Sequence, residues 1–336
     1  DGNNFKEMGG AKIAAMAQNM DGNNFKEMGG AKIAAMAQNM DGNNFKEMGG
    51  AKIATMAQNM DQNNFREMGG AKIATMAQNM NGANFKEMGG AKIAAMAQHM
   101  DGNNLKEMGG QQIARMGKEF GADDMKALGA KKLAAMAQNM DGDNFKEMSG
   151  TKVVLMAKEM DGKTLSEIGD KQAKGMAKSM ESNHLSTLES DQLAGLAKGI
   201  QAKEIVELGG EKLGAMVKGL TNEHLESLAI DSQDSESGFR AGLGVDGLSA
   251  RRDNHLASMM SGIKGDQIKD LETSKKTTVL KALKANFFGS DEVDFGQIAS
   301  AKTPSVRPTI SPDKVGKTKI ASANVARSFF SRTKFK

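Results

Sequence analysis

Large apolar residues recur along this chain at fixed places in a 20-residue repeat. The first repeat reads Asp-Gly-Asn-Asn-Phe-Lys-Glu-Met-Gly-Gly-Ala-Lys-Ile-Ala-Ala-Met-Ala-Gln-Asn-Met. The pattern continues without insertion or deletion through residue 220, which makes eleven repeats. Repeat positions 5, 8, 13, 16 and 20 hold Phe, Leu, Ile, Val or Met in all of them, with Ala173 as the one exception. Self-similarity at a fixed period predicts a repeat architecture.

The spacing inside each repeat predicts two helices. Positions 5 and 8 are one helical turn apart, and positions 13, 16 and 20 share one face of a second helix. The glycines at positions 9 and 10 interrupt the pattern, since two interior glycines would cost about 2 kcal/mol relative to alanine. Glycine is a typical helix stop, and the Asp that usually stands at position 1 is a typical N-cap. We therefore predict a short helix over positions 2–8 and a longer one over positions 11–19.

Helices of this length are not stable alone, so the repeats are expected to stack on one another. The predicted fold is all-α, an α-solenoid in which each repeat adds about one layer. The gaps between apolar positions do not follow the 3-4 alternation of a coiled coil, and no period-2 run predicts strands. The motif of a leucine-rich repeat is also missing. A different helical stack and a disordered low-complexity array are the remaining interpretations.

The apolar pattern continues beyond residue 220 in a disguised form. After Leu225 and Leu228, the next matching trio is displaced by a 23-residue insertion. The later matching residues are Leu256, Met259, Ile263, Ile268, Leu271, Leu280, Leu283 and Phe287. We therefore predict about thirteen repeats in four regions. These are a regular array (1–228), an insertion loop (229–254), the last divergent repeats as a cap (255–288) and a basic extended tail (289–336).

Charge distinguishes the tail from the rest of the chain. The net charge is +4, and residues 295–336 hold nine Lys or Arg against Asp313 alone. All three prolines lie in the tail, two of them after Thr303 and Ser311, which are candidate phosphorylation sites. We expect the tail to bind an acidic partner, namely RNA, an anionic membrane surface or an acidic protein, with a solvated tail that only aids solubility as the alternative. The candidate partner-binding residues are Arg307, Lys314, Lys317, Lys319, Arg327, Phe329, Phe330, Arg332, Lys334, Phe335 and Lys336.

The residue types and their spacing argue against disulfides, metal sites and catalytic residues. The chain has no Cys, which excludes disulfides, thiolate metal sites and Cys nucleophiles. The Asp-Gly-Asn-Asn segment lacks the ligand spacing of a calcium loop. Soft metal binding by the methionines is disfavoured because Leu and Ile replace them in later repeats. The four histidines share no metal spacing, and His184 and His224 are expected to be solvated. We predict no cofactor, no metal and no catalytic residues.

The sequence therefore predicts a non-enzymatic structural protein. A scaffold that spaces or bridges the protein components of a larger assembly, anchored through its tail, explains the near-identical repeats. A ribonucleoprotein subunit that uses the tail on nucleic acid is the first alternative, and a surface or extracellular matrix repeat protein is the second. No apolar run is long enough to span a bilayer. Asp1 occupies position 1 of a repeat, as expected after removal of a leader or in part of a longer array.

Overall fold

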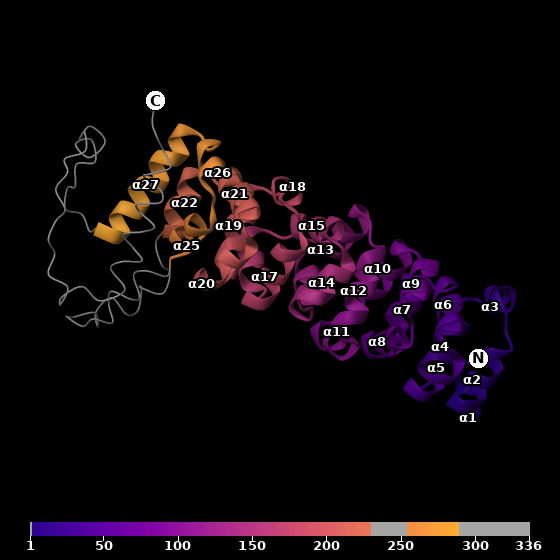
Figure 1. Cartoon of the computed structure of the whole chain (residues 1–336). Helices are drawn as coiled ribbons and strands as arrows, with labels where there is room; N and C mark the ends of the chain where they lie inside the picture. The colour runs from indigo at the N-terminus through magenta and orange to yellow at the C-terminus, as the bar shows by residue number, and fades with distance from the viewer. Residues whose placement is uncertain (1, 230–253, 289–336) are drawn as a thin grey trace, which may run out of the picture. The chain divides into compact units, whose positions relative to one another are not determined.

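The structure is a computed structural model that describes residues 2–229 and 254–288 (Figure 1). The chain forms two compact units, residues 1–201 and 202–336. Within the described ranges all regular elements are helices, and none of these residues forms a strand. The predicted all-α repeat fold is confirmed.

The first compact unit holds ten repeats, each with a short and a long helix. Gly129 has non-helical backbone angles between the two helices of the seventh repeat, which are counted together as α13. The bounds are α1 (Gly2–Met8), α2 (Gly10–Gln18), α3 (Gly22–Met28), α4 (Gly30–Gln38), α5 (Gly42–Met48), α6 (Gly50–Gln58), α7 (Gln62–Met68), α8 (Gly70–Gln78), α9 (Gly82–Met88), α10 (Gly90–Gln98), α11 (Gly102–Met108), α12 (Gly110–Glu119), α13 (Ala122–Gln138), α14 (Gly142–Met148), α15 (Gly150–Lys158), α16 (Gly162–Glu167), α17 (Asp170–Ser179), α18 (Ser182–Leu185) and α19 (Ser190–Gly199).

The short helix begins and ends where its residue types predict. In the third repeat the Asp41 side chain accepts a hydrogen bond from the Asn44 amide at 2.9 Å, and the Asn44 side chain accepts one from the Asp41 amide at 3.0 Å. The two side chains thus cap the helix reciprocally. The helix ends at Gly49, whose φ of +82° favours glycine. Ser149 adopts a similar φ of +79° and is the one non-glycine residue among those described that does so.

The long helix spans positions 10–18, so it begins one residue earlier than predicted. The carbonyl of the position-9 glycine already accepts a helical hydrogen bond, as Gly49 does from the Ile53 amide at 3.1 Å. The second glycine is therefore the first residue of the helix. At the other end, the Asn59 side chain donates to the Thr55 carbonyl at 2.9 Å and satisfies one of the last carbonyls.

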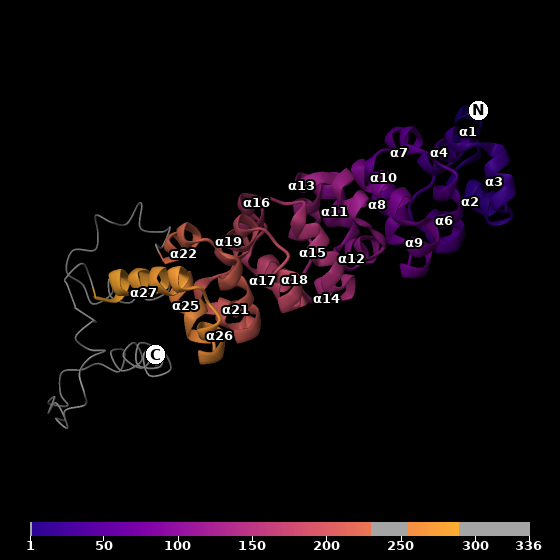
Figure 2. The ribbon, with the colours of Figure 1, turned by 90° about the horizontal axis from the view of Figure 1, so that it is seen from above.

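Successive helices of the first compact unit form a solenoid with three helices per turn. From α1 to α10, each helix packs against the helix three places further along, as α2 does against α5 and α6 against α9. Figure 2 shows one such row, α1, α4, α7, α10 and α13, along one edge of this unit. A turn therefore takes about 30 residues, or one and a half repeats. The expectation of one layer per repeat is wrong, because short and long helices alternate along each row.

The apolar repeat positions fill the interior between the three rows. Phe45, Ile53 and Met56 of the third repeat are 0 % exposed, and Met60 is 1 % exposed. The small side chains of Ala54 and Ala57 are also fully buried, which lets neighbouring helices approach closely. Methionine suits this interior because its flexible thioether fills irregular gaps.

The second compact unit repeats the same packing after the insertion. Its helices are α20 (Ala202–Ile205), the 3₁₀ turn η1 (Val206–Leu208), α21 (Gly210–Gly219), α22 (Asn222–Ala229), α25 (His255–Gly262), α26 (Gly265–Lys269) and α27 (Thr273–Phe288). α20 packs against α25, α21 against α26 and α22 against α27. The helices α25, α26 and α27 thus stand where the twelfth and thirteenth repeats require them. The expectation of about thirteen two-helix repeats is confirmed.

Two predicted regions fall outside the described residues. Of the insertion loop 229–254, the structure describes Ala229 at the end of α22 and Asn254 at the start of α25. None of the tail residues 289–336 is described. The insertion loop and the extended tail therefore stay predictions.

Candidate interaction surface

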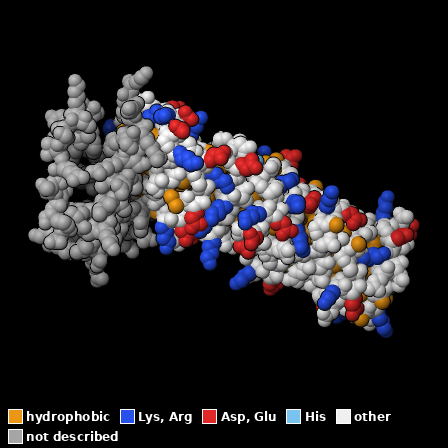
Figure 3. Space-filling model, viewed as in Figure 1, with side chains coloured by type: hydrophobic (Ala, Val, Ile, Leu, Met, Phe, Trp, Pro, Cys, Tyr) orange, Lys and Arg blue, Asp and Glu red, His pale blue; other side chains and the backbone are white. Residues whose placement is uncertain are grey.

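The outer surface of the first compact unit is polar and nearly neutral. Each of the first four repeats carries two acidic and two basic side chains, Asp at position 1, Glu at position 7, and Lys or Arg at positions 6 and 12. In Figure 3 the Lys, Arg, Asp and Glu side chains are interspersed over the described part of the visible face. Such a surface does not attract a polyanion over a long range, because opposite charges screen one another.

Successive turns of the solenoid are joined by a recurring contact that we call the glycine junction. It joins the glycine at position 10, the carbonyl at position 19 of the next repeat and the side chain at position 4 two repeats later. A Cβ atom added to Gly50 would lie 2.9 Å from the Asn79 carbonyl oxygen and would also collide with the Asn84 side-chain oxygen. Only glycine fits there. The same junction recurs at Gly10, Gly30, Gly70 and Gly110.

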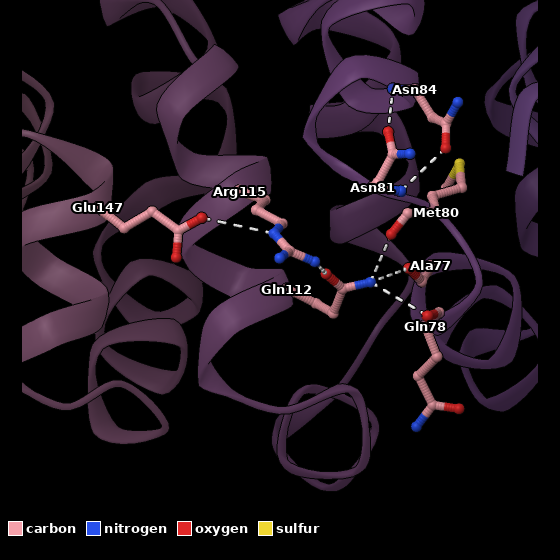
Figure 4. Close-up of polar contacts among 8 residues, drawn as sticks. All are labelled: Ala77, Gln78, Met80, Asn81, Asn84, Gln112, Arg115 and Glu147. Carbon is pink, nitrogen blue, oxygen red and sulfur yellow. Dashed lines mark hydrogen bonds and ion pairs between the residues drawn. The ribbon is translucent and has the colours of Figure 1, made fainter.

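The asparagine of the junction serves two neighbours at once. Asn84 is 7 % exposed, and its side-chain oxygen accepts a hydrogen bond from the Asn81 amide at 2.9 Å (Figure 4). The same oxygen lies against Gly50. Asn81 in turn accepts from the Asn84 amide at 3.1 Å. The residue that caps a short helix is therefore also the residue that contacts the preceding turn.

A second recurring contact joins position 12 to a carbonyl two repeats earlier. The Lys92 ammonium group donates to the Met60 carbonyl at 2.5 Å, and Lys52 and Lys72 donate in the same way to the carbonyls of Met20 and Met40. These carbonyls follow the ends of long helices, where the helix dipole favours a positive charge. We call this series the position-12 ladder.

Glutamine replaces lysine in three rungs of the ladder. Gln112 donates to the carbonyls of Ala77 and Met80, both at 2.7 Å, so one amide nitrogen serves the end of α8 (Figure 4). Arg115 donates to the Gln112 side-chain oxygen at 2.7 Å and pairs with Glu147 at 3.4 Å. Neutral Gln thus substitutes for Lys, which shows that hydrogen bonding rather than charge defines the rung. Gln172 and Gln192 make the same kind of contact.

The ladder predicts a difference between two substitutions of Lys72. Lys72→Met should lower the free energy of unfolding by about 1–3 kcal/mol, because it leaves the buried Met40 carbonyl without a donor. Lys72→Gln should be nearly neutral. Urea unfolding followed by circular dichroism measures both. Lys12→Met is the control, since Lys12 is exposed and its side chain has no hydrogen bond to the described residues. Equal losses for Met and Gln at position 72 would refute the ladder.

The two histidines at position 4, which we expected to be solvated, are half-buried. The His184 ring nitrogen Nδ1 accepts from the Glu181 amide at 3.2 Å, and His224 Nδ1 lies 2.9 Å from the Thr221 hydroxyl. His184 therefore replaces the capping asparagine, whereas His224 contacts the side chain of the capping residue. A Cβ at Gly150 would lie 3.0 Å from His184 Nδ1, so His184 also completes a glycine junction.

His99 occupies position 19, where asparagine stands in the first four repeats. Burial lowers the pKa of His99 from its ordinary value of 6.5, and the charges of Arg66 and Lys132 lower the pKa further. Its ring nitrogen Nε2 is buried and has no hydrogen-bond partner among the described residues. The folded protein therefore favours the neutral imidazole.

This lowered pKa predicts a loss of stability on acidification. The unfolded chain binds a proton near pH 6.5 while the folded protein does not, so the contribution of His99 is complete above pH 6.5. It is lost as the pH falls from there through the lower, folded pKa. His99→Asn should flatten the fall in the urea midpoint between about pH 8 and pH 5. If the urea midpoint of the unchanged protein and that of His99→Asn fell in parallel with pH, this assignment would be contradicted.

Within residues 2–229 and 254–288, no group of three or more His, Cys, Asp or Glu residues is arranged to hold a metal ion. In those same ranges no helix combines the length and the apolar character needed to cross a membrane.

The predicted partner-binding residues, from Arg307 to Lys336, all lie outside the described residues, as do Thr303 and Ser311. The structure neither brings them together nor separates them. Sequence reasoning missed the glycine junction and the position-12 ladder. Their signal is in the sequence, because position 10 is glycine in most repeats and position 12 is Lys or Gln in the first eleven.

Comparisons of the chain with models of known protein families, with curated proteins and with solved structures found no match.

Proposed function

We propose that this protein is a non-enzymatic scaffold that spaces or bridges the components of a larger assembly. The observation that carries the proposal is the recurrence of the glycine junction from Gly10 to Gly150. Because these junctions use the same repeat positions each time, a repeat that carries the junction residues can be added or removed without a new kind of contact. Stability in such an array is close to a sum of repeat and neighbour terms. This property suits a spacer.

The outer surface supports the same proposal. Near-identical repeats present the same exposed residues again and again, and their charges balance. A single specific site for one partner would require a repeat that differs from its neighbours. Attachment is assigned in this proposal to the tail, where residues 295–336 carry nine Lys or Arg and one acid. Salt-sensitive binding should therefore depend on the tail and not on the array.

The test compares the full chain with a chain ending at residue 288 in a pull-down at about 0.05 M and 0.5 M salt. The full chain should capture an acidic partner at low salt and release it at high salt, and the shortened chain should capture nothing. Capture that survives loss of residues 289–336 would refute anchoring through the tail.

A matched pair of tail variants separates charge from apolar contact. The first replaces Arg327, Arg332 and Lys334 by glutamine, and the second replaces Phe329, Phe330 and Phe335 by leucine. Loss of partner capture in the first variant alone indicates a purely electrostatic anchor. Loss in both, together with sensitivity of the complex to ribonuclease, would favour the ribonucleoprotein function over the scaffold, because the phenylalanines would then stack on bases.

A further inference from the structure

The link between α14 and α15 departs from the regular repeat in its backbone. In the first five repeats this link is a glycine with φ between +80° and +83°. Ser149 takes its place with a φ of +79° and a ψ of +147°, a region that is nearly restricted to glycine. The Ser149 amide donates to the Lys146 carbonyl three residues back, whereas Gly49 donates to Phe45 four residues back. The link therefore holds strain that the regular repeats avoid.

The helix before the link is held firmly on two sides. A Cβ added to Gly117 of α12 would lie 2.5 Å from the Met148 sulfur, so the missing side chain makes room for Met148. Met148 is accordingly 0 % exposed, whereas Met48 is 6 % exposed. On the α17 side, a Cβ added to Gly175 would lie 2.9 Å from the Cα atom of Gly142. Backbone strain persists where contacts of this kind fix the chain.

The helix after the link is held less firmly. Thr151 and Val154 occupy positions of α15 that are alanine in the first repeat, and both have a lower helix propensity than alanine. The next helix in its row, α18, has only four residues. A Cβ added to Gly150 would lie 3.0 Å from His184 Nδ1, compared with 1.9 to 2.2 Å from the asparagine oxygen in five other glycine junctions. The side-chain part of this junction is therefore looser.

We propose that Ser149 and α15 form a hinge within the first compact unit. Opening at Ser149 releases the backbone strain and gives up the contacts of a weakly held helix, so α15 should open before the other long helices of this unit. α15 belongs to the row of α10, α13 and α18. The packing of α12 on α14 and of α14 on α17 lies in another row and does not involve α15. The array therefore bends at this level and does not come apart.

The neighbouring links show that the strain is specific to Ser149. The corresponding residues of the seventh and ninth repeats are Gly129 and Gly169, which adopt a positive φ without a side chain. Glu189 of the tenth repeat has a φ of −69° and needs no glycine. The inference goes beyond the proposed scaffold function, because it assigns a movement to the array and not a partner. A hinge lets the repeats on its two sides present their exposed groups at more than one angle.

Hydrogen exchange of the full chain, followed by mass spectrometry, tests the opening. After correction for intrinsic rates, α15 should exchange at least about tenfold faster than α6 and α10. Ser149→Gly should slow exchange of α15 by about tenfold and leave α10 unchanged, because glycine adopts this backbone without strain. Ser149→Ala is the matched control, since it removes the hydroxyl and keeps the strain. It should leave the exchange of α15 within about twofold. Equal effects of the two substitutions, or none for Ser149→Gly, would overturn the proposal.

A distance measurement tests the bending. The chain has no cysteine, so pairs of introduced cysteines can carry nitroxide labels. Lys126→Cys with Lys198→Cys spans the hinge, whereas Lys46→Cys with Lys106→Cys lies on one side of it, and all four lysines are exposed. We expect a broad distance distribution for the first pair, which narrows with Ser149→Gly, and a narrow distribution for the second pair. Equally narrow distributions for both pairs in the otherwise unchanged chain would also overturn the proposal.

Discussion

Replacing Phe85 by alanine is expected to lower the free energy of local unfolding around α9 by about 3–5 kcal/mol. Phe85 is 0 % exposed in α9, which packs against α6, α10 and α12. Because each helix contacts only nearby turns, the loss should stay local. Hydrogen exchange measured by mass spectrometry should show faster exchange in α6, α9, α10 and α12 and little change at α2 or α17.

A matched control exists within the chain itself. The next repeat has Leu105 at the position of Phe85, and Leu105 is also 0 % exposed. Phe85→Leu should therefore cost less than about 1.5 kcal/mol, as expected for a conservative exchange in a core. Faster exchange spread evenly over residues 2–201 would show that the array unfolds as one cooperative block, contrary to this expectation.

The second large effect is expected from Gly50→Ala, even though alanine is the better helix former. Helix propensity alone would favour the variant by about 1 kcal/mol. Against this, the new Cβ would lie 2.9 Å from the Asn79 carbonyl oxygen and closer still to the Asn84 side chain. Overpacking of this kind typically costs about 1–3 kcal/mol. We expect a net destabilisation, visible as a lower urea midpoint and as faster exchange of α6 and α9.

Another repeat suggests how to separate the two collisions. Ala130 stands at position 10 of the seventh repeat, and its partner at position 4 two repeats later is Thr164 and not Asn. Gly50→Ala combined with Asn84→Thr should therefore recover part of the lost stability. Gly102→Ala serves as a control, because a Cβ there meets nothing within 4 Å. A double variant no more stable than Gly50→Ala alone would show that the backbone carbonyl, and not the side chain, dominates the clash.

The helices could be predicted because their boundaries depend on local residue types. Asp41 caps the short helix and Gly49 ends it, and both roles are visible from the sequence alone. The predicted start of the long helix is wrong by one residue, because the two adjacent glycines look equivalent in the sequence. In the structure they differ, since Gly49 needs a positive φ and Gly50 needs an absent side chain.

The arrangement of three helices per turn could not be predicted in the same way. It depends on contacts between residues such as Gly50 and Asn84, which lie 34 positions apart. Because every repeat has nearly the same sequence, the pattern fits a partner one, two or three repeats away equally well. Only the drifted repeats break this ambiguity, as where Asp124 replaces asparagine opposite Gly90 and His184 does so opposite Gly150. The predicted tail residues depend on no such pattern, and their partner stays a prediction.

The mismatch between two helices per repeat and three helices per turn has a genetic consequence. Tandem copies in a gene expand and contract by whole repeats. Loss of residues 41–60 would remove two helices and shift every later helix of the first compact unit to a different row, so that all its exposed groups would face another direction. Loss of residues 41–100 would remove six helices and restore the original facing, two turns shorter. A change of three repeats therefore alters only the length of the solenoid. A change of one or two repeats also alters the direction in which the later exposed groups face.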